Sequence, residues 1–342
     1  MAILPKKSQY ILEVRTYGRE ITDTNWEVIE VNLRDFWAIA KISFRNKTVK
    51  FENELYDIET DFESLYEHFR DLVVALQGIA NGTIDLRSSV DPFPRDPVII
   101  TINVTSIHDK RLHDSIVENY IYDIFLIANI SAPSSLNIYV SSLSVDGKIL
   151  NKEISLTSTI FEVSYLQDIS GGLALPSVLS PDDTWRWYFD IRKSPTQVSK
   201  DPIERIFFAL LHMARVSDSP TNVVWIFYCL ETLFDTKVGE NFRVLTDRIG
   251  IFLELETKSI AVVKKKLRNL YDFRSSLVHG GQPIIHPMHN DILDKEVVEQ
   301  TNKIIQGLDF GYVLIFSCLQ KLVRNHWTSL AFTEIMTGTK AS

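Results

Sequence analysis

The spacing of apolar residues changes near residue 195, and this change constrains the fold more than any other feature of the sequence. From residue 201 to residue 325, apolar residues recur three and four positions apart, as they do on one face of an α-helix. Before residue 195, many segments instead alternate or are rich in β-branched residues. We therefore predict an α+β domain over residues 1–195, followed by an all-α helical bundle over residues 196–342.

Six segments of the first half are predicted to be β-strands because they are rich in Val, Ile and aromatic residues. They cover residues 26–31, 36–44, 49–58, 98–104, 120–128 and 136–140. Residues 60–79 have helical spacing and predict a helix. The pair Asp146-Gly147 lies between two apolar runs and predicts a hairpin turn.

The stretch over residues 170–201 is rich in glycine and proline, which marks a domain boundary. It also contains Trp185, Trp187 and Tyr188, so we expect it to pack against the protein. A platform on which nucleic-acid bases stack is the alternative interpretation of these aromatic residues.

Five helices are predicted in the second half. They begin at residues 201, 223, 240, 259 and 291, and the last one ends near residue 325. Asp201 and Glu204 have the spacing of a capping box, with Pro202 at the favoured first helical position. The pair Gly280-Gly281 is typical of a helix end.

Arg274 interrupts the apolar stripe of the fourth predicted helix. The other members of this stripe are Ile260, Val263, Leu267, Leu270 and Leu277. A guanidinium on a core-facing stripe is costly unless it is paired or faces a partner or a wet cleft. His279 follows five residues later, where the helix ends. Because arginine binds phosphate oxygens through two N–H groups and histidine transfers protons near neutral pH, the two residues suit phosphate chemistry. The alternatives are an ion pair between Arg274 and Glu231, and a capping role for His279.

The string from Tyr271 to Gly280 reads Tyr-Asp-Phe-Arg-Ser-Ser-Leu-Val-His-Gly. It resembles the motif of the HEPN superfamily, in which an arginine is followed by four to six residues and a histidine. The form Tyr-x-x-Arg-Ser-x-x-Val-His-Gly is similar to the Apea-like subset of that superfamily. The resemblance covers residues 200–330, and Ser275 stands where many members carry asparagine.

The resemblance implies a HEPN-like bundle that acts as a metal-independent endoribonuclease and a homodimer, in a bacterial defence or toxin-like setting. In this hypothesis the domain over residues 1–195 senses or regulates. Two helices that carry Arg274 and His279 would form one composite cleft for an RNA substrate. His279 would move the proton of the 2′-OH or of the leaving 5′-oxygen, and Arg274 would stabilise charge on the phosphate. Ser275, Tyr271 and Glu231 are the expected supporting residues.

Lys264, Lys265, Lys266 and Arg268 lie on the same predicted helix and are candidates to hold the RNA backbone. A solvated helix face is the alternative interpretation of these four residues. Two other functions also remain open for the helical half. One is a non-catalytic dimerisation or scaffold module, and the other is a protein regulated by a partner nucleotidyltransferase with Tyr271 as the acceptor.

The net charge of −8 argues against a protein that coats nucleic acid. This charge is unevenly distributed, because residues 52–71 hold eight acidic residues against one basic residue. Residues 241–274 hold eight basic residues against four acidic ones. The sequence therefore permits a single basic cleft that admits RNA, and the acidic segment is a candidate to shield it.

Cofactor, metal and membrane signals are weak in this chain. The sequence has neither a Gly-rich phosphate loop nor a Gly-x-Ser-x-Gly turn, so we expect no cofactor. His286, His289 and Asp291 offer metal-type ligands, but no further Cys or spaced His completes a set, so we expect no metal. The first residues lack the apolar core of a signal peptide, and the apolar runs are too short to span a membrane. With its two cysteines in apolar runs, the chain is predicted to be cytoplasmic.

Overall fold

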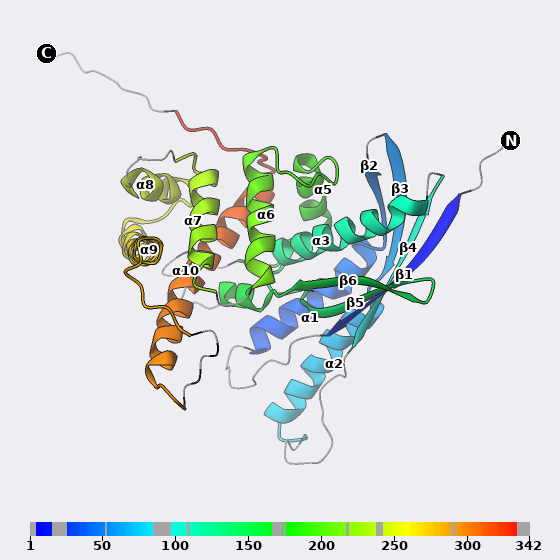
Figure 1. Ribbon diagram of the computed structural model, residues 1–342, viewed down its shortest axis with the longest axis horizontal. Coiled ribbons are helices and arrows are strands. Elements are labelled where there is room, and N and C mark those ends of the chain that lie inside the picture. The colour runs from blue at the N-terminus through cyan, green and yellow to red at the C-terminus, as the bar shows by residue number, and fades with distance from the viewer. Residues whose placement is uncertain are drawn as a thin grey trace, which may run out of the picture.

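A six-stranded antiparallel sheet is the main element of the N-terminal half. The computed structural model describes residues 5–15, 26–51, 53–84, 97–107, 110–165, 173, 176–216, 219–236, 242–286, 288, 290 and 292–333. The strands are β1 (Lys6–Arg15), β2 (Asn46–Phe51), β3 (Glu54–Asp61), β4 (Val98–Ser106), β5 (Ile138–Val145) and β6 (Lys148–Leu156). Their order in the sheet is β2-β3-β4-β1-β5-β6. In Figure 1 the sheet stands at the right, and the helices fill the space to its left.

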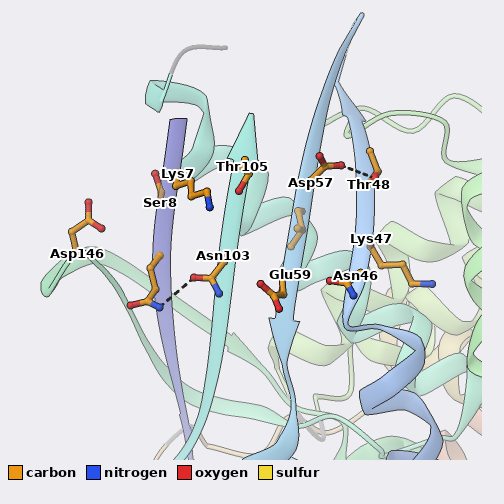
Figure 2. Close-up of a pocket in the computed structure, with 12 residues that line it drawn as sticks. Lys7, Ser8, Asn46, Lys47, Thr48, Asp57, Glu59, Asn103, Thr105 and Asp146 are labelled. Atoms are coloured by element: carbon orange, nitrogen blue, oxygen red, sulfur yellow. Dashed lines mark hydrogen bonds between the residues drawn. The ribbon is translucent and has the colours of Figure 1, made fainter. Parts of the chain in front are cut away.

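The two faces of the sheet differ in polarity because side chains alternate along each strand. On β1, Tyr10, Leu12 and Val14 are buried against the helices, whereas the residues between them are more exposed. The opposite face is polar, and Figure 2 shows the side chains that line a shallow hollow of about 830 Å³ there. The Thr48 hydroxyl donates to Asp57 (2.8 Å) across β2 and β3. The Gln9 amide donates to Asn103 (3.2 Å) across β1 and β4.

The first 135 residues, where the structure describes them, contain the α-helices α1 (Trp26–Ser43), α2 (Glu63–Ala80) and α3 (His113–Ser131). Helix α2 confirms the helix predicted at residues 60–79. The strands predicted at residues 26–31, 36–44 and 120–128 are wrong, because these segments lie in α1 and α3. In α3, every residue from Asp123 to Ser131 is buried, so the apolar residues of this segment follow one another without helical period.

The remaining strand predictions fall on strands. Residues 98–104 lie in β4, and residues 136–140 overlap the start of β5. Residues 49–58 contain parts of both β2 and β3, which form a hairpin. The predicted turn at Asp146-Gly147 joins β5 to β6, and both residues have positive φ angles (48° and 78°), as a tight hairpin requires.

The stretch predicted to separate the halves, residues 170–201, contains the helix α5 (Pro181–Ile191). A short 3₁₀ helix, η2 (Thr159–Tyr165), precedes this stretch. Trp187 and Tyr188 are fully buried, and the Tyr188 ring stacks on Phe207 at 4.6 Å. The Trp185 ring packs on Phe189 at 4.6 Å. The expectation that these aromatic residues pack against the protein is confirmed. The Gly171-Gly172 pair lies outside the described residues.

The five helices predicted in the second half are all present. They are α6 (Pro202–Arg215), α7 (Asn222–Leu233), α8 (Phe242–Phe252), α9 (Thr257–Val278) and α10 (Glu296–Arg324). At the start of α6, the Asp201 carboxylate accepts the Glu204 N–H (2.9 Å), as predicted. The Glu204 carboxylate accepts the N–H of Lys200 (2.6 Å), so the return bond of the capping box is shifted by one residue.

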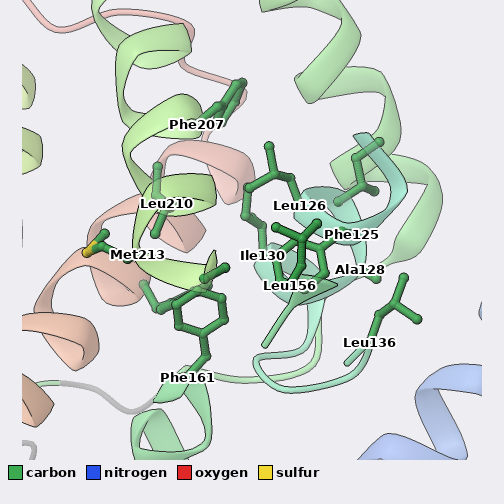
Figure 3. Packing of buried hydrophobic residues seen from close by; sticks show 14 of the residues in the cluster. Phe125, Leu126, Ala128, Ile130, Leu136, Leu156, Phe161, Phe207, Leu210 and Met213 are labelled. Atoms are coloured by element: carbon green, nitrogen blue, oxygen red, sulfur yellow. The ribbon is translucent and has the colours of Figure 1, made fainter. Parts of the chain in front are cut away.

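The predicted fold class, an α+β domain followed by an all-α, HEPN-like helical bundle, is wrong. The N-terminal half is built on the antiparallel sheet, and one buried cluster continues from that sheet into the C-terminal helices. Figure 3 shows the two sides of this junction, with Phe125 and Ile130 on α3 and Phe207 and Leu210 on α6, all members of the same buried cluster. Phe161 of η2 packs on Phe316 of α10 at 4.8 Å. The helical content predicted after residue 200 is correct, but these helices share their core with α3.

In the part of the chain that the structure describes, no helix is both long and apolar enough to cross a membrane.

Candidate functional site

Arg274 lies on the stripe of α9 that packs toward α7 and α10. Val263, Leu267 and Leu270 on this stripe are buried, and the Arg274 side chain is 29% exposed. Its Nη1 donates to Glu231 Oε1 of α7 (2.9 Å), and its guanidinium lies 5.2 Å from the ring centre of Phe227. The ion pair that the sequence left open as an alternative is therefore present. A guanidinium has five N–H groups, so this single hydrogen bond does not saturate it.

His279 caps the C-terminal end of α9, and its side chain is exposed. Its backbone N–H donates to the Ser275 carbonyl (3.0 Å), and Gly280 follows with a φ of 75°. The glycine after the helix takes this left-handed conformation at low cost, which confirms the predicted helix end. The Arg274 side chain points toward α7, where its hydrogen bond and its ring contact lie. Among the described residues, neither of these contacts involves the His279 ring.

The predicted supporting residues have different surroundings. Ser275 is exposed on α9. The Tyr271 ring is half-buried and packs edge-on against Phe227 (5.6 Å between ring centres) and against Phe242 (5.3 Å). Glu231 is the partner of Arg274. Tyr271 is thus held in an aromatic cluster beside the Arg274–Glu231 pair.

The four predicted RNA-binding residues lie on two sides of α9. Lys264 pairs with Asp247 of α8 (3.0 Å), and this hydrogen bond is the main cause that lowers the pKa of the Asp247 carboxyl. The Arg268 guanidinium lies 4.0 Å from the ring centre of Phe242, also toward α8. Lys266 points to the other side, 5.5 Å from the ring centre of Phe310 of α10. Lys265 is exposed. The four cations therefore do not form one continuous patch.

A hollow of about 960 Å³ lies between α9 and α10. Its lining includes Lys266 and Ser276 from α9 and Lys303 from α10, but neither Arg274 nor His279. It therefore adjoins the end of α9 without containing the two predicted catalytic residues.

A buried charged cluster, which sequence reasoning missed, joins α3, α5 and α6. Arg192 is 4% exposed, its Nε lies 2.9 Å from Asp123 Oδ1, and its Nη1 lies 3.4 Å from Glu204 Oε1. The Tyr188 hydroxyl donates to Asp123 (2.7 Å). Burial raises the pKa of the Asp123 carboxyl to about 6, against the opposing effect of the Arg192 charge. The sequence held one signal of this cluster, namely that Asp123 is the single acid in the apolar run over residues 120–128.

A second buried polar group lies where α3 begins. The His113 ring is fully buried, with Nδ1 2.8 Å from the Ser8 hydroxyl of β1 and Nε2 2.9 Å from the Ser106 hydroxyl of β4. Both ring nitrogens have partners, so His113 anchors the helix to the sheet.

Metal ligands do not gather in the described residues, where no three His, Cys, Asp or Glu side chains are placed to share an ion. Of the weak metal-type group, His286 is exposed, and its Nδ1 accepts the Met288 N–H (3.1 Å). His289 and Asp291 lie outside the described residues.

The chemistry that this arrangement offers is an exposed histidine at a helix end and a half-buried arginine with unused N–H groups on the same helix. Comparisons of the chain with protein-family models, with curated proteins and with solved structures give no match. Function must therefore be inferred from the residues of the chain itself.

Proposed function

We propose that this chain is a metal-independent endoribonuclease that acts as a homodimer, with Arg274 and His279 of both copies at one cleft. The observation that carries the proposal is the environment of these residues. His279 is exposed at the end of α9, and Arg274 is oriented by Glu231 while most of its N–H groups stay unused. The resemblance of the α9 sequence to HEPN proteins supports the same assignment and suggests a defence or toxin-like setting.

The face around the Arg274–Glu231 pair has properties expected of a dimer interface. Val224 and Tyr228 precede Glu231 on α7 at helical spacing, so the three share one side of that helix. Val224 and Tyr228 are exposed, as is Val278 on α9 at 60%. Docking of a second copy on this face would bury these apolar side chains. It would also place two α9 ends at one cleft, which a single copy lacks.

At this cleft the proposed reaction needs proton transfer and charge stabilisation. His279 takes the proton of a ribose 2′-OH, or protonates the departing 5′-oxygen, while the 2′-oxygen forms a bond to phosphorus. The bond from phosphorus to the 5′-oxygen breaks, which leaves a 2′,3′-cyclic phosphate and a 5′-OH. The unused N–H groups of Arg274 stabilise the negative charge on the phosphate oxygens. Lys265, which is exposed on α9, is a candidate to hold the flanking backbone.

The proposed location is the cytoplasm. Cys229 and Cys318 are both buried as free thiols, as expected of a protein that keeps its thiols reduced. Burial raises the pKa of each thiol far above its ordinary value, so neither is a nucleophile at neutral pH.

A non-catalytic dimerisation module is the second candidate function. It is favoured by the Arg274–Glu231 ion pair and by the packing of Arg274 on Phe227, which give the arginine a structural role. In that case the α7–α9 face would still bind a second copy, but no RNA would be cut. The packed Tyr271 ring, by contrast, does not favour modification by a partner nucleotidyltransferase.

The test is cleavage of end-labelled RNA in EDTA by the full-length chain and its variants. We expect His279→Ala to lose at least about 100-fold in rate, the contribution of a general acid or base. The matched control is His286→Ala, which removes an exposed histidine from the neighbouring loop and should cleave like the wild type.

A product ending in 2′,3′-cyclic phosphate, and the failure of a strand with 2′-deoxyribose at the cut position, would support 2′-OH attack. Equal rates for the wild type and His279→Ala would refute the assignment. A dimeric chain that leaves RNA intact would favour the non-catalytic module.

A further inference from the structure

A groove between α3 and α6 lies where the N-terminal half meets the C-terminal helices. On α3 it is lined by Ser115, Asn119 and Tyr122, and on α6 by Phe208, Leu211, His212 and Arg215. In both helices these positions are three or four residues apart, so each helix presents one face to the groove. Residues 195–197 and Phe51 of β2 complete the lining. The volume of about 680 Å³ is typical of a small-molecule site.

The walls of the groove are mainly apolar side chains that the core buries only in part. They are Phe51, Leu112, Tyr122, Phe208 and Leu211. One side of each side chain packs on the core, and the other side faces the groove. An apolar or aromatic ligand body would remove this surface from water, which is the main source of affinity in such sites.

The floor of the groove is rigid because it rests on the buried charged cluster. Arg192 lines the groove and is held by Asp123 and Glu204. Asn119 accepts hydrogen bonds from Arg192 (3.4 Å) and from the Gln197 amide (2.9 Å). The groove is therefore formed by fixed polar groups before any ligand arrives, which lowers the entropic cost of binding.

The rim carries positive charge at the end of α6. Arg215 is exposed in the last turn of this helix, and no carboxylate of the described residues lies within ion-pair distance of it. His212 lies one turn earlier, with its ring stacked on Trp225 at 4.7 Å and almost parallel to it. Glu118 is the one carboxylate among the described residues of the lining. The charge of Arg192 is already balanced by Asp123 and Glu204, so Arg215 is the cation of the lining that is left to pair with a ligand. This charge balance favours an anionic ligand.

We infer that the groove between α3 and α6 binds a small organic anion with an aromatic or otherwise apolar body. The apolar body lies against Phe208, Leu211 and Tyr122, and the acidic group pairs with Arg215. This site is distinct from Arg274 and His279, and it does not depend on the proposed ribonuclease activity. Because α3 comes from the N-terminal half, a bound ligand would contact both halves of the chain at once.

Two dyes that differ by one charged group test the inference in the full-length chain. Anilinonaphthalene sulfonate is an aromatic anion, and N-phenylnaphthylamine is the same ring system without the sulfonate. We expect the anion to bind at one saturable site by fluorescence titration. Arg215→Gln should weaken its binding by about tenfold, as expected for one lost charge-assisted contact, and should leave the neutral dye unchanged.

Two further variants complete the experiment. Arg243→Gln is the control, because it removes another exposed arginine (79% side-chain exposure) that lies on α8 and does not line the groove. This variant should bind both dyes like the wild type. Ser115→Trp places a large ring at an exposed position of the lining and should abolish binding of both dyes without affecting folding. Unsaturable binding of the anion, equal affinity of Arg215→Gln and the wild type, or full binding by Ser115→Trp would each overturn the inference.

Discussion

The guanidinium groups of Arg192 and Arg274 lie in two different environments. Arg192 is 4% exposed and lies between two buried carboxylates at the junction of α3, α5 and α6. Arg274 is 29% exposed and has one carboxylate partner on the face shared by α7 and α9. Both pack against a phenylalanine ring, Phe208 for Arg192 and Phe227 for Arg274. The two regions therefore differ in burial and in the number of partners.

This difference separates a structural arginine from one that is free to act. Removing one member of a buried ion pair leaves an uncompensated charge, whereas a pair near the surface contributes little to stability. Arg192 therefore holds the fold together, and few of its N–H groups remain for a ligand. Arg274 is oriented by Glu231 but keeps N–H groups for a phosphate.

The largest expected effect comes from Arg192. Arg192→Met keeps most of the side-chain volume but leaves Asp123 and Glu204 without their cation. We expect the free energy of unfolding at neutral pH to fall by about 3–5 kcal/mol, measured by urea denaturation. Arg186→Met is the matched control, because Arg186 lies on the same helix, is exposed and pairs with Asp183 at the surface. A loss below about 1 kcal/mol for Arg192→Met would remove the contrast between the two regions.

An intermediate effect is expected from the titration of Asp123. Its pKa is raised from 3.8 to about 6 in the folded state, chiefly by burial. The folded state therefore binds more protons than the unfolded state between these two values. The contribution of Asp123 to stability is thus greatest below pH 4 and is lost as the pH rises toward 6. Urea denaturation across this range should show a decline in stability that Asp123→Asn abolishes.

The control for this titration is Asp190→Asn, which removes an exposed acid from α5, the helix that packs against α3. It should keep the wild-type decline between pH 4 and pH 6. An Asp123→Asn variant whose stability falls with pH as steeply as the wild type would show that Asp123 does not titrate in this range.

The smallest expected effect on stability comes from Arg274. Arg274→Met removes an ion pair that is partly exposed, so the free energy of unfolding should fall by no more than about 1 kcal/mol. The same urea denaturation measures this loss. If Arg274→Met and Arg192→Met were equally destabilising, Arg274 would be a structural arginine and the non-catalytic module would become the better explanation.

The success of sequence reasoning depended on how each helix is buried. Helices α6 to α9 bury one face, so their apolar residues keep a spacing of three and four. Helix α10 keeps this spacing as well, although every residue from Leu308 to Gln320 is buried. Helix α1 also buries Ile29, Leu33 and Phe36 at helical spacing, but its β-branched residues favoured a strand prediction. Helix α3 is buried on all sides from Asp123 to Ser131, and only its length distinguishes this segment from a buried strand.

The sequence predicted those residues of the candidate site that lie on a single helix. Arg274 and His279 lie on one helix, and the broken stripe and the glycine stop identified both positions. Glu231 was named as the partner of Arg274 because it is an acid on a nearly all-apolar helix. Asp123 and Glu204 were missed as partners of Arg192, since Glu204 was explained by helix capping and Asp123 by a strand that does not exist.

The sequence by itself determined the helices of the C-terminal half, the hairpin at Asp146-Gly147 and the position of Arg274 on the stripe of α9. These features depend on backbone preferences and spacing within one segment. Only the tertiary structure decided that α3 enters the helical core, that Arg192 is enclosed by two carboxylates and that a groove remains between α3 and α6. These features arise where distant segments meet, because burial and charge pairing are properties of the packed chain and not of its local order.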